Sequence, residues 1–446
     1  MTPEVRDRID QIRQGIVPEG YKNTKFGILP DNWSVRTIAE CLERVERPVD
    51  VQANKMYTQI GIRSHGKGLF YKEPVTGDSL GNKAVFWIEP NCFILNIVFA
   101  WEQAIGKTTQ AEVGMIGSHR FPMYRPTKGN LDIDYLIFYL LTKRGTDILE
   151  AASPGGAGRN RTLGQDRFMK SRVVLPPLDE QKKIAAILAT QDKTLELQAR
   201  KIDELKRFKK GCMERMFPKK GQKVPEKRFP GFAGDWEQRK FDEVFDCTVP
   251  NNTLSRAELS YDEGTVLNVH YGDVLIKYGS VLDVQKDDIP RIPHRCREDF
   301  NGALLQDGDV IIADTAEDET TGKACEIGNL QGSAIVSGLH TMVCRPRNRM
   351  ALGYLGYYLN SNAYHHQLLP LMQGIKVLSL SRSNIQKTSV SYPIAVKEQQ
   401  LIAYYFSQLD HLITLHQRKL EEMKKQKKAL MQLLLTGIVR TKGDEQ

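Results

Sequence analysis

The fold is decided by one stretch, EQKKIAAILATQDKTLELQARKIDELKRFKKGCM at 180–213, and its second copy, EQQLIAYYFSQLDHLITLHQRKLEEMKKQKKALM at 398–431. The copies lie 218 residues apart, and 13 of their 34 positions are identical. Solenoid repeats have periods of roughly 20–50 residues, so a period this long indicates two domain-sized copies. We therefore expect two globular parts, each followed by a long helix, and a target that is itself bipartite.

Both stretches carry an apolar stripe whose spacing alternates between four and three residues, which is the heptad pattern of a coiled coil. The predicted seam residues are Ile184, Leu188, Leu195, Ile202 and Leu205 in the first copy and Ile402, Phe406, Leu409, Ile413, Leu420 and Met423 in the second. So narrow a stripe buries against a single helix. The shared register favours the other copy as that partner, and a pseudo-twofold relation would make the pair antiparallel. Alternatively, each helix packs only on its own globular part.

Prolines and polar runs predict the boundaries between domains. We expect an N-terminal extension at 1–20, a globular domain at 21–178, a helix at 179–217, a linker at 218–228, a second globular domain at 229–392, a helix at 393–440 and a tail at 441–446. Short β-type runs are mixed with helical segments in both globular parts, which indicates an α+β fold of two similar mixed α/β domains. The landmark Gly106-Lys107 parallels Gly322-Lys323, whereas the sequences between landmarks diverge.

Composition favours a non-membrane protein with an anionic partner. The formal charge is +9 and the pI is near 9.0, although basic proteins without such a partner are also common. Basic residues crowd the C-terminal halves of both helices, where a solvated face, a nucleic-acid backbone or an acidic partner subunit would each fit. Seven cysteines form no CxxC pair, which indicates a reducing, cytoplasmic compartment. The N-terminus has no apolar signal-peptide core.

Catalytic and cofactor motifs are absent from the sequence. Gly106-Lys107-Thr108 resembles the end of a phosphate-binding loop, but Trp101 occupies the position of the first glycine. The acidic run Asp314–Glu319 lacks calcium-loop spacing, so a solvated loop is the simpler interpretation. We therefore expect a chain that binds without catalysing and that holds no cofactor or metal.

The segments LPPLDEQKKIAAIL (175–188) and YPIAVKEQQLIAYYF (392–406), each following a domain that begins near LPDNW (29–33) or FAGDW (232–236), resemble the specificity subunit of Type I restriction-modification systems. The second copy departs from the pattern in having a single proline and a longer run before its Glu-Gln. The resemblance implies two target recognition domains separated by two long antiparallel coiled-coil helices. It also implies a double-stranded DNA target in two parts, two methyltransferase subunits for adenine methylation, and restriction subunits. SAM, ATP and Mg²⁺ chemistry would then belong to those partners.

Exposed basic and aromatic loop residues are the predicted DNA contacts. They are Arg63, His65, Lys67, Lys107, Arg120, Arg159 and Arg161 in the first domain and His270, Tyr271, Lys277, Lys323, His340, Lys376 and Arg382 in the second. Such residues would hydrogen-bond to base edges or phosphates. Two alternatives are a coiled-coil adaptor without DNA contact and a self-contained DNA-modifying enzyme.

Overall fold

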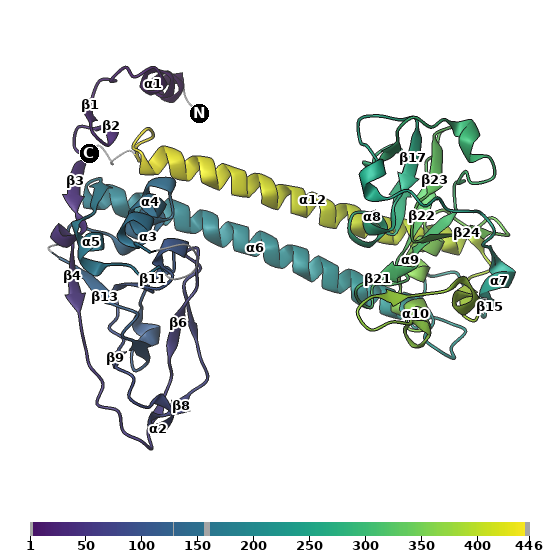
Figure 1. The fold of residues 1–446 in the computed structure, drawn as a ribbon, viewed down its shortest axis with the longest axis horizontal. Helices are drawn as coiled ribbons and strands as arrows, with labels where there is room; N and C mark the ends of the chain where they lie inside the picture. The colour runs from purple at the N-terminus through teal and green to yellow at the C-terminus, as the bar shows by residue number, and fades with distance from the viewer. Residues whose placement is uncertain (1–2, 128, 156–160, 442–446) are drawn as a thin grey trace. The chain divides into compact units, whose positions relative to one another are not determined.

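The structure is a computed structural model and describes residues 3–127, 129–155 and 161–441. The chain divides into two compact units (Figure 1). Unit 1 comprises residues 1–198 and 419–446, and unit 2 comprises residues 199–418. Each long helix therefore contributes one part to each unit.

Unit 1 is built on a four-stranded antiparallel sheet in the order β11-β10-β13-β4. The strands are β4 (Leu42–Val45), β10 (Phe93–Leu95), β11 (Ile105–Lys107) and β13 (Met123–Pro126). The accompanying helices are α3 (Ile133–Leu140), α4 (Lys143–Ala152) and α5 (Gln165–Lys170). Phe93 and Phe168 stack in the core with ring centroids 6.1 Å apart, which joins the sheet to α5.

Shorter antiparallel strand pairs complete unit 1. Strand β5 pairs with β8, β6 with β7, β9 with β12, and β3 with β14 near the start of the long helix. Their bounds, with those of the other short elements, are α1 (Pro3–Arg13), β1 (Tyr21–Thr24), β2 (Gly27–Pro30), β3 (Ser34–Thr37), β5 (Met56–Tyr57), β6 (Ile60–Ile62), β7 (Leu69–Tyr71), β8 (Val75–Thr76), α2 (Gly77–Leu80), β9 (Val85–Trp87), β12 (Ile116–Ser118) and β14 (Arg172–Leu175).

Unit 2 contains a five-stranded sheet in the order β16-β24-β20-β22-β18 and a separate three-stranded sheet, β19-β17-β23. The larger sheet is formed by β16 (Phe245–Asp246), β18 (Val281–Asp283), β20 (Val310–Ala313), β22 (Ala324–Gly328) and β24 (Thr341–Pro346). The other elements are β15 (Glu237–Lys240), α7 (Phe241–Val244), β17 (Val266–Val269), α8 (Tyr271–Ile276), β19 (Arg291–Ile292), β21 (Thr315–Ala316), β23 (Ala334–Ser337), α9 (Tyr354–Leu359), α10 (Asn362–His365), β25 (Leu378–Ser379), α11 (Arg382–Ile385) and β26 (Ser389–Tyr392).

The two units share one core topology, because β22-β20-β24-β16 repeats the order β11-β10-β13-β4. Phe93 pairs with the residue just before Arg-Pro in β13, and Val310 pairs with the residue just before Arg-Pro in β24, so the two are equivalent. Phe93 lies opposite Lys107, and Val310 lies opposite Glu326. Lys107 therefore corresponds to Glu326, and the predicted match with Lys323 is wrong. The Gly-Lys pairs look alike in sequence, but the strand pairing aligns Lys107 with a residue three positions after Lys323.

The repeated stretches form the long helices α6 (Leu178–Met216) and α12 (Val396–Leu435). In unit 1, Asp192 of α6 pairs with Lys427 of α12, and Ile184 shares a core with Leu434. In unit 2, Lys209 pairs with Asp410 at 2.6 Å, and the Cys212 Sγ lies 3.5 Å from the Tyr405 hydroxyl. Because α6 numbers rise as α12 numbers fall, the helical segments run antiparallel within each unit.

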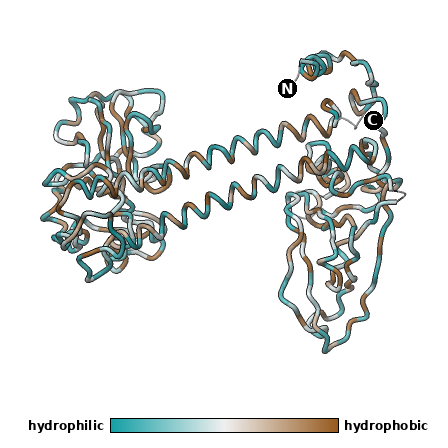
Figure 2. The backbone as a smooth tube through the Cα atoms, turned by 180° about the vertical axis from the view of Figure 1, so that it is seen from behind, coloured by the Kyte–Doolittle hydropathy of each residue, from teal (hydrophilic) through white to brown (hydrophobic). Residues whose placement is uncertain are grey.

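Hydrophobic and hydrophilic residues alternate along both long helices, as Figure 2 shows. The predicted seam side chains are all buried or half-buried: Ile184, Leu188, Ile202, Leu205, Ile402, Phe406 and Ile413 are buried, and Leu195, Leu409, Leu420 and Met423 are half-buried. The narrow apolar stripe thus lies against protein, while the polar faces remain in water.

The glutamine of each Glu-Gln pair ties the long helix to the globular part of its unit. The Gln181 side-chain amide donates to the backbone oxygens of Asn130 and Pro176 and accepts from the Asp132 N–H at 2.9 Å. In the second copy, Gln399 accepts from the Ala351 N–H at 2.9 Å and donates to the Pro393 oxygen at 2.9 Å. Both amides are buried, so they satisfy backbone groups that water does not reach.

The glutamate of each pair forms a bidentate ion pair with an arginine. In unit 2, Arg228 contacts both Glu398 oxygens, at 2.6 and 2.8 Å. In unit 1, Arg440 contacts both Glu180 oxygens at 2.7 Å. Glu180 also accepts from the Trp33 indole N–H at 3.1 Å. The Glu-Gln motif is thus a buried junction between helix and domain.

Candidate nucleic-acid interface

Three of the predicted DNA contacts meet in unit 2 as the His340 cluster, defined as His270, Tyr271, His340 and Asp314. The His340 Nδ1 lies 3.4 Å from Asp314, and the ring packs edge-on against Tyr271 with centroids 5.3 Å apart. The Tyr271 ring centroid lies 4.7 Å from that of His270. His340 has a φ of +53°, a conformation that histidine adopts more readily than most residues. The cluster presents imidazole, phenol and carboxylate groups together, and all three can hydrogen-bond to base edges.

His270 is buried, which differs from the exposed loop position expected from the sequence. Its Nδ1 accepts from the Gly272 N–H at 3.2 Å at the start of α8. Burial lowers the pKa of His270, so its ring is neutral near pH 7. Because Nδ1 acts as an acceptor, the ring proton lies on Nε2. The side chain therefore packs against Tyr271 and caps the start of α8.

A second group of polar side chains follows α8. Arg256 contacts Asp273 at 2.5 Å and the Tyr261 hydroxyl at 2.6 Å. The Lys277 Nζ lies 4.7 Å from the Tyr261 ring centroid, and the side chain pairs with Asp288 at 2.8 Å. Arg256 and Tyr261 were not among the predicted contacts. They lie in a polar loop far from any repeat landmark, so only the structure brings them to Lys277.

Lys323 does not occupy the exposed position predicted for it. Its Nζ donates to the backbone oxygens of Leu275 and Tyr278, at 2.9 and 3.1 Å. Burial lowers its pKa. A lysine at these carbonyls complements the negative end of the α8 dipole. Lys376 and Arg382, by contrast, are exposed as predicted.

In unit 1, Arg63, His65 and Lys67 lie in the loop between β6 and β7, and all three are exposed. The backbone N–H of His65 donates to the Glu102 oxygen at 2.8 Å, which anchors the loop. The Arg63 guanidinium lies 5.3 Å from the Phe70 ring centroid. The loop therefore presents an arginine, a histidine and a lysine from a fixed backbone.

The other predicted residues of unit 1 are dispersed. Lys107 is half-buried in β11 and pairs with Asp134 at 2.6 Å, so it does not lie on an exposed loop. Arg120 is exposed in the turn after β12, and the Arg161 guanidinium lies 5.3 Å from the Trp101 ring centroid. Arg159 lies outside the described residues. The structure therefore brings together the loop at 63–68 and leaves Lys107, Arg120 and Arg161 apart from it.

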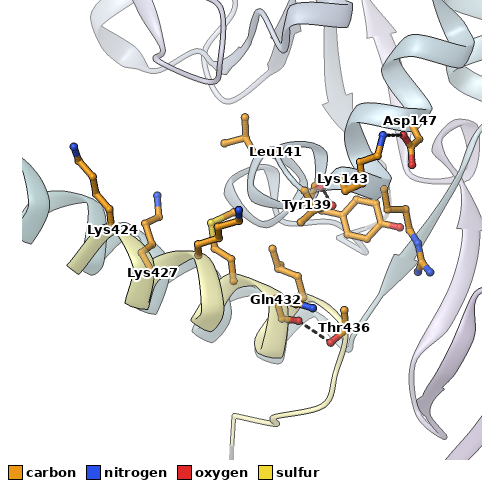
Figure 3. Close-up of a pocket in the computed structure, with 13 residues that line it drawn as sticks. Tyr139, Leu141, Lys143, Asp147, Lys424, Lys427, Gln432 and Thr436 are labelled. Atoms are coloured by element: carbon orange, nitrogen blue, oxygen red, sulfur yellow. Dashed lines mark hydrogen bonds and ion pairs between the residues drawn. The ribbon is translucent and has the colours of Figure 1, made fainter. Parts of the chain in front are cut away.

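A basic groove of about 800 Å³ lies in unit 1 between α3–α4 and the end of α12 (Figure 3). It is lined by Tyr139, Leu141, Thr142, Lys143, Arg144, Asp147, Lys424, Lys427, Lys428, Met431, Gln432, Leu435 and Thr436. Lys143 pairs with Asp147 at 2.6 Å, and the chains of Lys424 and Lys427, which pair with Glu421 and Asp192, rise from α12 (Figure 3). Five cationic side chains around an apolar floor suit a polyanion or an acidic helix.

Unit 2 has smaller cavities at the positions that the repeat makes equivalent, between α9–α10 and the end of α6. Arg215, Lys219, Lys220 and His366 line one of about 430 Å³, and Lys210, Met213 and His365 line another of about 390 Å³. In the sequence, the basic residues in the C-terminal halves of the repeated helices indicate these sites. The contributions from α4 and α10 could not be seen in the sequence because they depend on packing.

A sequence model of the Type I restriction modification DNA specificity domain matches this chain at residues 30–207 and 233–425. The chain belongs to this family. Each matched segment begins close to the tryptophan at the start of a repeat and extends into a long helix, which is consistent with two specificity domains.

Two curated relatives of Methanocaldococcus jannaschii resemble the chain over nearly its whole length. The putative type I restriction enzyme MjaX specificity subunit is 23% identical over 452 residues, covering 95% of this chain and 97% of the relative. The type I restriction enzyme MjaVIII specificity subunit is 23% identical over 449 residues, covering 96% and 99%. A solved chain of a type I R-M system has a TM-score of 0.59 at 17% identity, covering 92% of this chain and 99% of its own. That likeness shows a shared fold.

The part of this family member that the structure describes contains no group of three or more His, Cys, Asp or Glu side chains arranged to hold a metal ion. Asp318, in the acidic run, instead accepts from the backbone N–H and hydroxyl of Thr320, at 2.9 and 2.5 Å. Among the described residues, no helix has the length and apolar character needed to cross a bilayer.

Proposed function

We propose that this chain is the DNA-recognition subunit of a Type I restriction-modification complex and that each unit reads one half of a bipartite target. The observation that carries the proposal is one core topology with different surroundings. The four-stranded order recurs in both units, whereas the β5-β8 and β6-β7 hairpins of unit 1 and the three-stranded β19-β17-β23 sheet of unit 2 differ from one another. A shared scaffold with unlike loops suits two different half-sites.

The chemistry of the exposed loops supports readout of DNA bases. The His340 cluster and the β6–β7 loop present imidazole, phenol and guanidinium groups that can hydrogen-bond in the major groove. The basic grooves at the helix ends would attract phosphates and make binding salt-dependent. The fourteen predicted contacts remain predictions, and His270 and Lys323 would act by supporting neighbouring loops.

We further propose that α6 and α12 act as an antiparallel spacer between two target recognition domains. At 1.5 Å per residue, helices of 39 and 40 residues are about 60 Å long. Half-sites read on one face of B-DNA lie about 34 Å apart, so helices of this length can span the gap. Two methyltransferase subunits would dock on the chain and methylate adenines, and restriction subunits would cleave. The chain would be non-catalytic, and the complex would act in the cytoplasm.

Methylome sequencing tests the function directly. Cells producing this chain with its methyltransferase partner are expected to show adenine methylation at a split motif with a fixed gap. Contiguous motifs, or methylation without this chain, would contradict the proposal. Methylation or cleavage by the isolated chain would favour a self-contained enzyme, and an assembled complex without DNA affinity would favour an adaptor.

The spacer role can be tested by deleting one heptad from each helix. Counted from the Lys209–Asp410 pair, residues 201–207 lie opposite 412–418. Removing both segments keeps the heptad register and shortens each helix by about 10 Å. The gap in the methylated motif should shrink by about 3 base pairs, at 3.4 Å each, with the half-sites unchanged. An unchanged gap would refute the spacer.

A further inference from the structure

Unit 2 exposes one apolar side chain completely. Ile375 has a relative exposure of 101%, the highest of the exposed large hydrophobic residues in the described part of the chain. It lies at the tip of the hairpin formed by residues 373–379, next to the exposed Lys376. A single exposed apolar residue is common on protein surfaces, so its role depends on how the tip is supported and what surrounds it.

The hairpin holds this tip in a tight turn. Gln373 and Ser379 exchange backbone hydrogen bonds of 3.0 and 2.8 Å. Gly374 has a φ of +127°, and a Cβ at that position would lie 1.9 Å from the Val377 carbonyl oxygen. Only glycine fits so close an approach. The turn therefore presents Ile375 on a constrained backbone, which lowers the entropy lost when its side chain binds.

The hairpin also adjoins the residues predicted to contact bases. Strand β25, its second arm, pairs with β21, and the Leu380 N–H donates to the Asp314 carbonyl oxygen at 2.8 Å. Asp314 in turn contacts His340. The base of the hairpin is thus linked through Asp314 to the His340 cluster. Lys376 beside it and Arg382 after it are exposed cations suited to flanking phosphates.

We propose that Ile375 is a wedge that inserts between adjacent base pairs of the half-site bound by unit 2. This inference rests on the proposed DNA recognition and adds a mode of contact to it. Burial of the side chain between bases offsets part of the cost of unstacking them, and such apolar wedges kink DNA by roughly 20–90°. A contact with a thymine methyl group would bury the same side chain but leave the duplex straight.

The test compares Ile375→Ala with Ile394→Ala. Ile394 is the same residue type, has a relative exposure of 72% and lies in the same unit, so it is a matched control. Each variant is assembled with its methyltransferase partner and bound to a duplex carrying the split target. Affinity is measured by titration, and bending is measured by energy transfer between dyes at the duplex ends.

Ile375→Ala should weaken specific binding by about tenfold and reduce the bend, because it removes several buried methylene equivalents. Ile375→Leu should restore both, and Ile394→Ala should match the parent. A bend unchanged in Ile375→Ala would overturn the wedge while leaving DNA recognition intact. If the unsubstituted complex bound the duplex with the split target no more tightly than other duplexes, the proposed function itself would be overturned.

Discussion

Replacing Arg228 by methionine is expected to destabilise unit 2 more than the equivalent change of Arg440 destabilises unit 1. Arg228 supplies both contacts to Glu398, a residue that is completely buried. Methionine keeps most of the aliphatic stem and removes the guanidinium. Glu398 would then be a buried carboxylate without a charged partner, which is costly because the low-dielectric interior cannot replace its hydration.

The magnitude follows from what each glutamate retains. Breaking a buried ion pair on one side costs about 3–5 kcal/mol, and this range should apply to Arg228→Met. Glu180 keeps the Trp33 indole N–H at 3.1 Å when Arg440 is removed. A hydrogen bond to a charged group contributes about 1.5–3 kcal/mol, so Arg440→Met should cost about 2 kcal/mol. Trp236, the counterpart of Trp33, has no hydrogen-bond partner for its buried indole nitrogen and gives Glu398 no such support.

Hydrogen exchange measured by mass spectrometry resolves the two units, because peptides from each report its own opening free energy. The double variant Arg228→Met with Glu398→Gln should recover much of the loss, since a neutral amide is cheaper to bury. Equal effects of the two arginine variants would refute the role assigned to Trp33. A cost below about 1 kcal/mol for Arg228→Met would show that Glu398 is effectively solvated.

Three further substitutions test the cores. Burial raises the pKa of Glu326 to about 7 from a model-compound value of 4.5, so the native state binds a proton that the unfolded state releases between those pH values. The free energy of unfolding of unit 2 should therefore fall by about 3 kcal/mol as the pH rises from 4.5 to 7. Urea unfolding at several pH values should show this fall in the parent chain and not in Glu326→Gln. Gln399→Ala should destabilise unit 2 by about 2 kcal/mol, because it leaves the Ala351 N–H and the Pro393 oxygen without their buried partner. Gln181→Ala should destabilise unit 1 by more than this, because the Gln181 amide bonds to three backbone groups. Hydrogen exchange measures both losses, and a larger loss for Gln399→Ala would contradict the prediction.

The long helices and the family were accessible from the sequence because their signals are periodic and repeated. Heptad spacing identifies the residues that are buried along α6 and α12, and the Glu-Gln pair marks where each helix leaves its domain. The role of that pair was not accessible. Arg228 precedes Glu398 by 170 residues and Arg440 follows Glu180 by 260, so no local pattern connects them.

The candidate interface was only partly predictable. The sequence predicts loop positions for His270, Tyr271 and His340, and the structure brings them together through α8 and the turn before β24. Lys107 and Lys323 share a Gly-Lys landmark, but strand pairing makes Lys107 equivalent to Glu326 instead. Register is set by side chains that alternate between the two faces of a sheet, and strands of three to five residues carry too few of them to fix it from sequence.

The distribution of identity between the repeats has a physical explanation. Glu180, Gln181 and their counterparts are buried, and each bonds to groups that water cannot reach, so changing one leaves an unpaired polar atom behind. The tip at Ile375 and the exposed loop at 63–68 contribute little to the buried cores, so substitution there changes what the surface presents at little cost in stability. The helix junction can therefore remain constant while the loops diverge. Under the proposed function, two different half-sites would then require no change in the helices proposed to separate them.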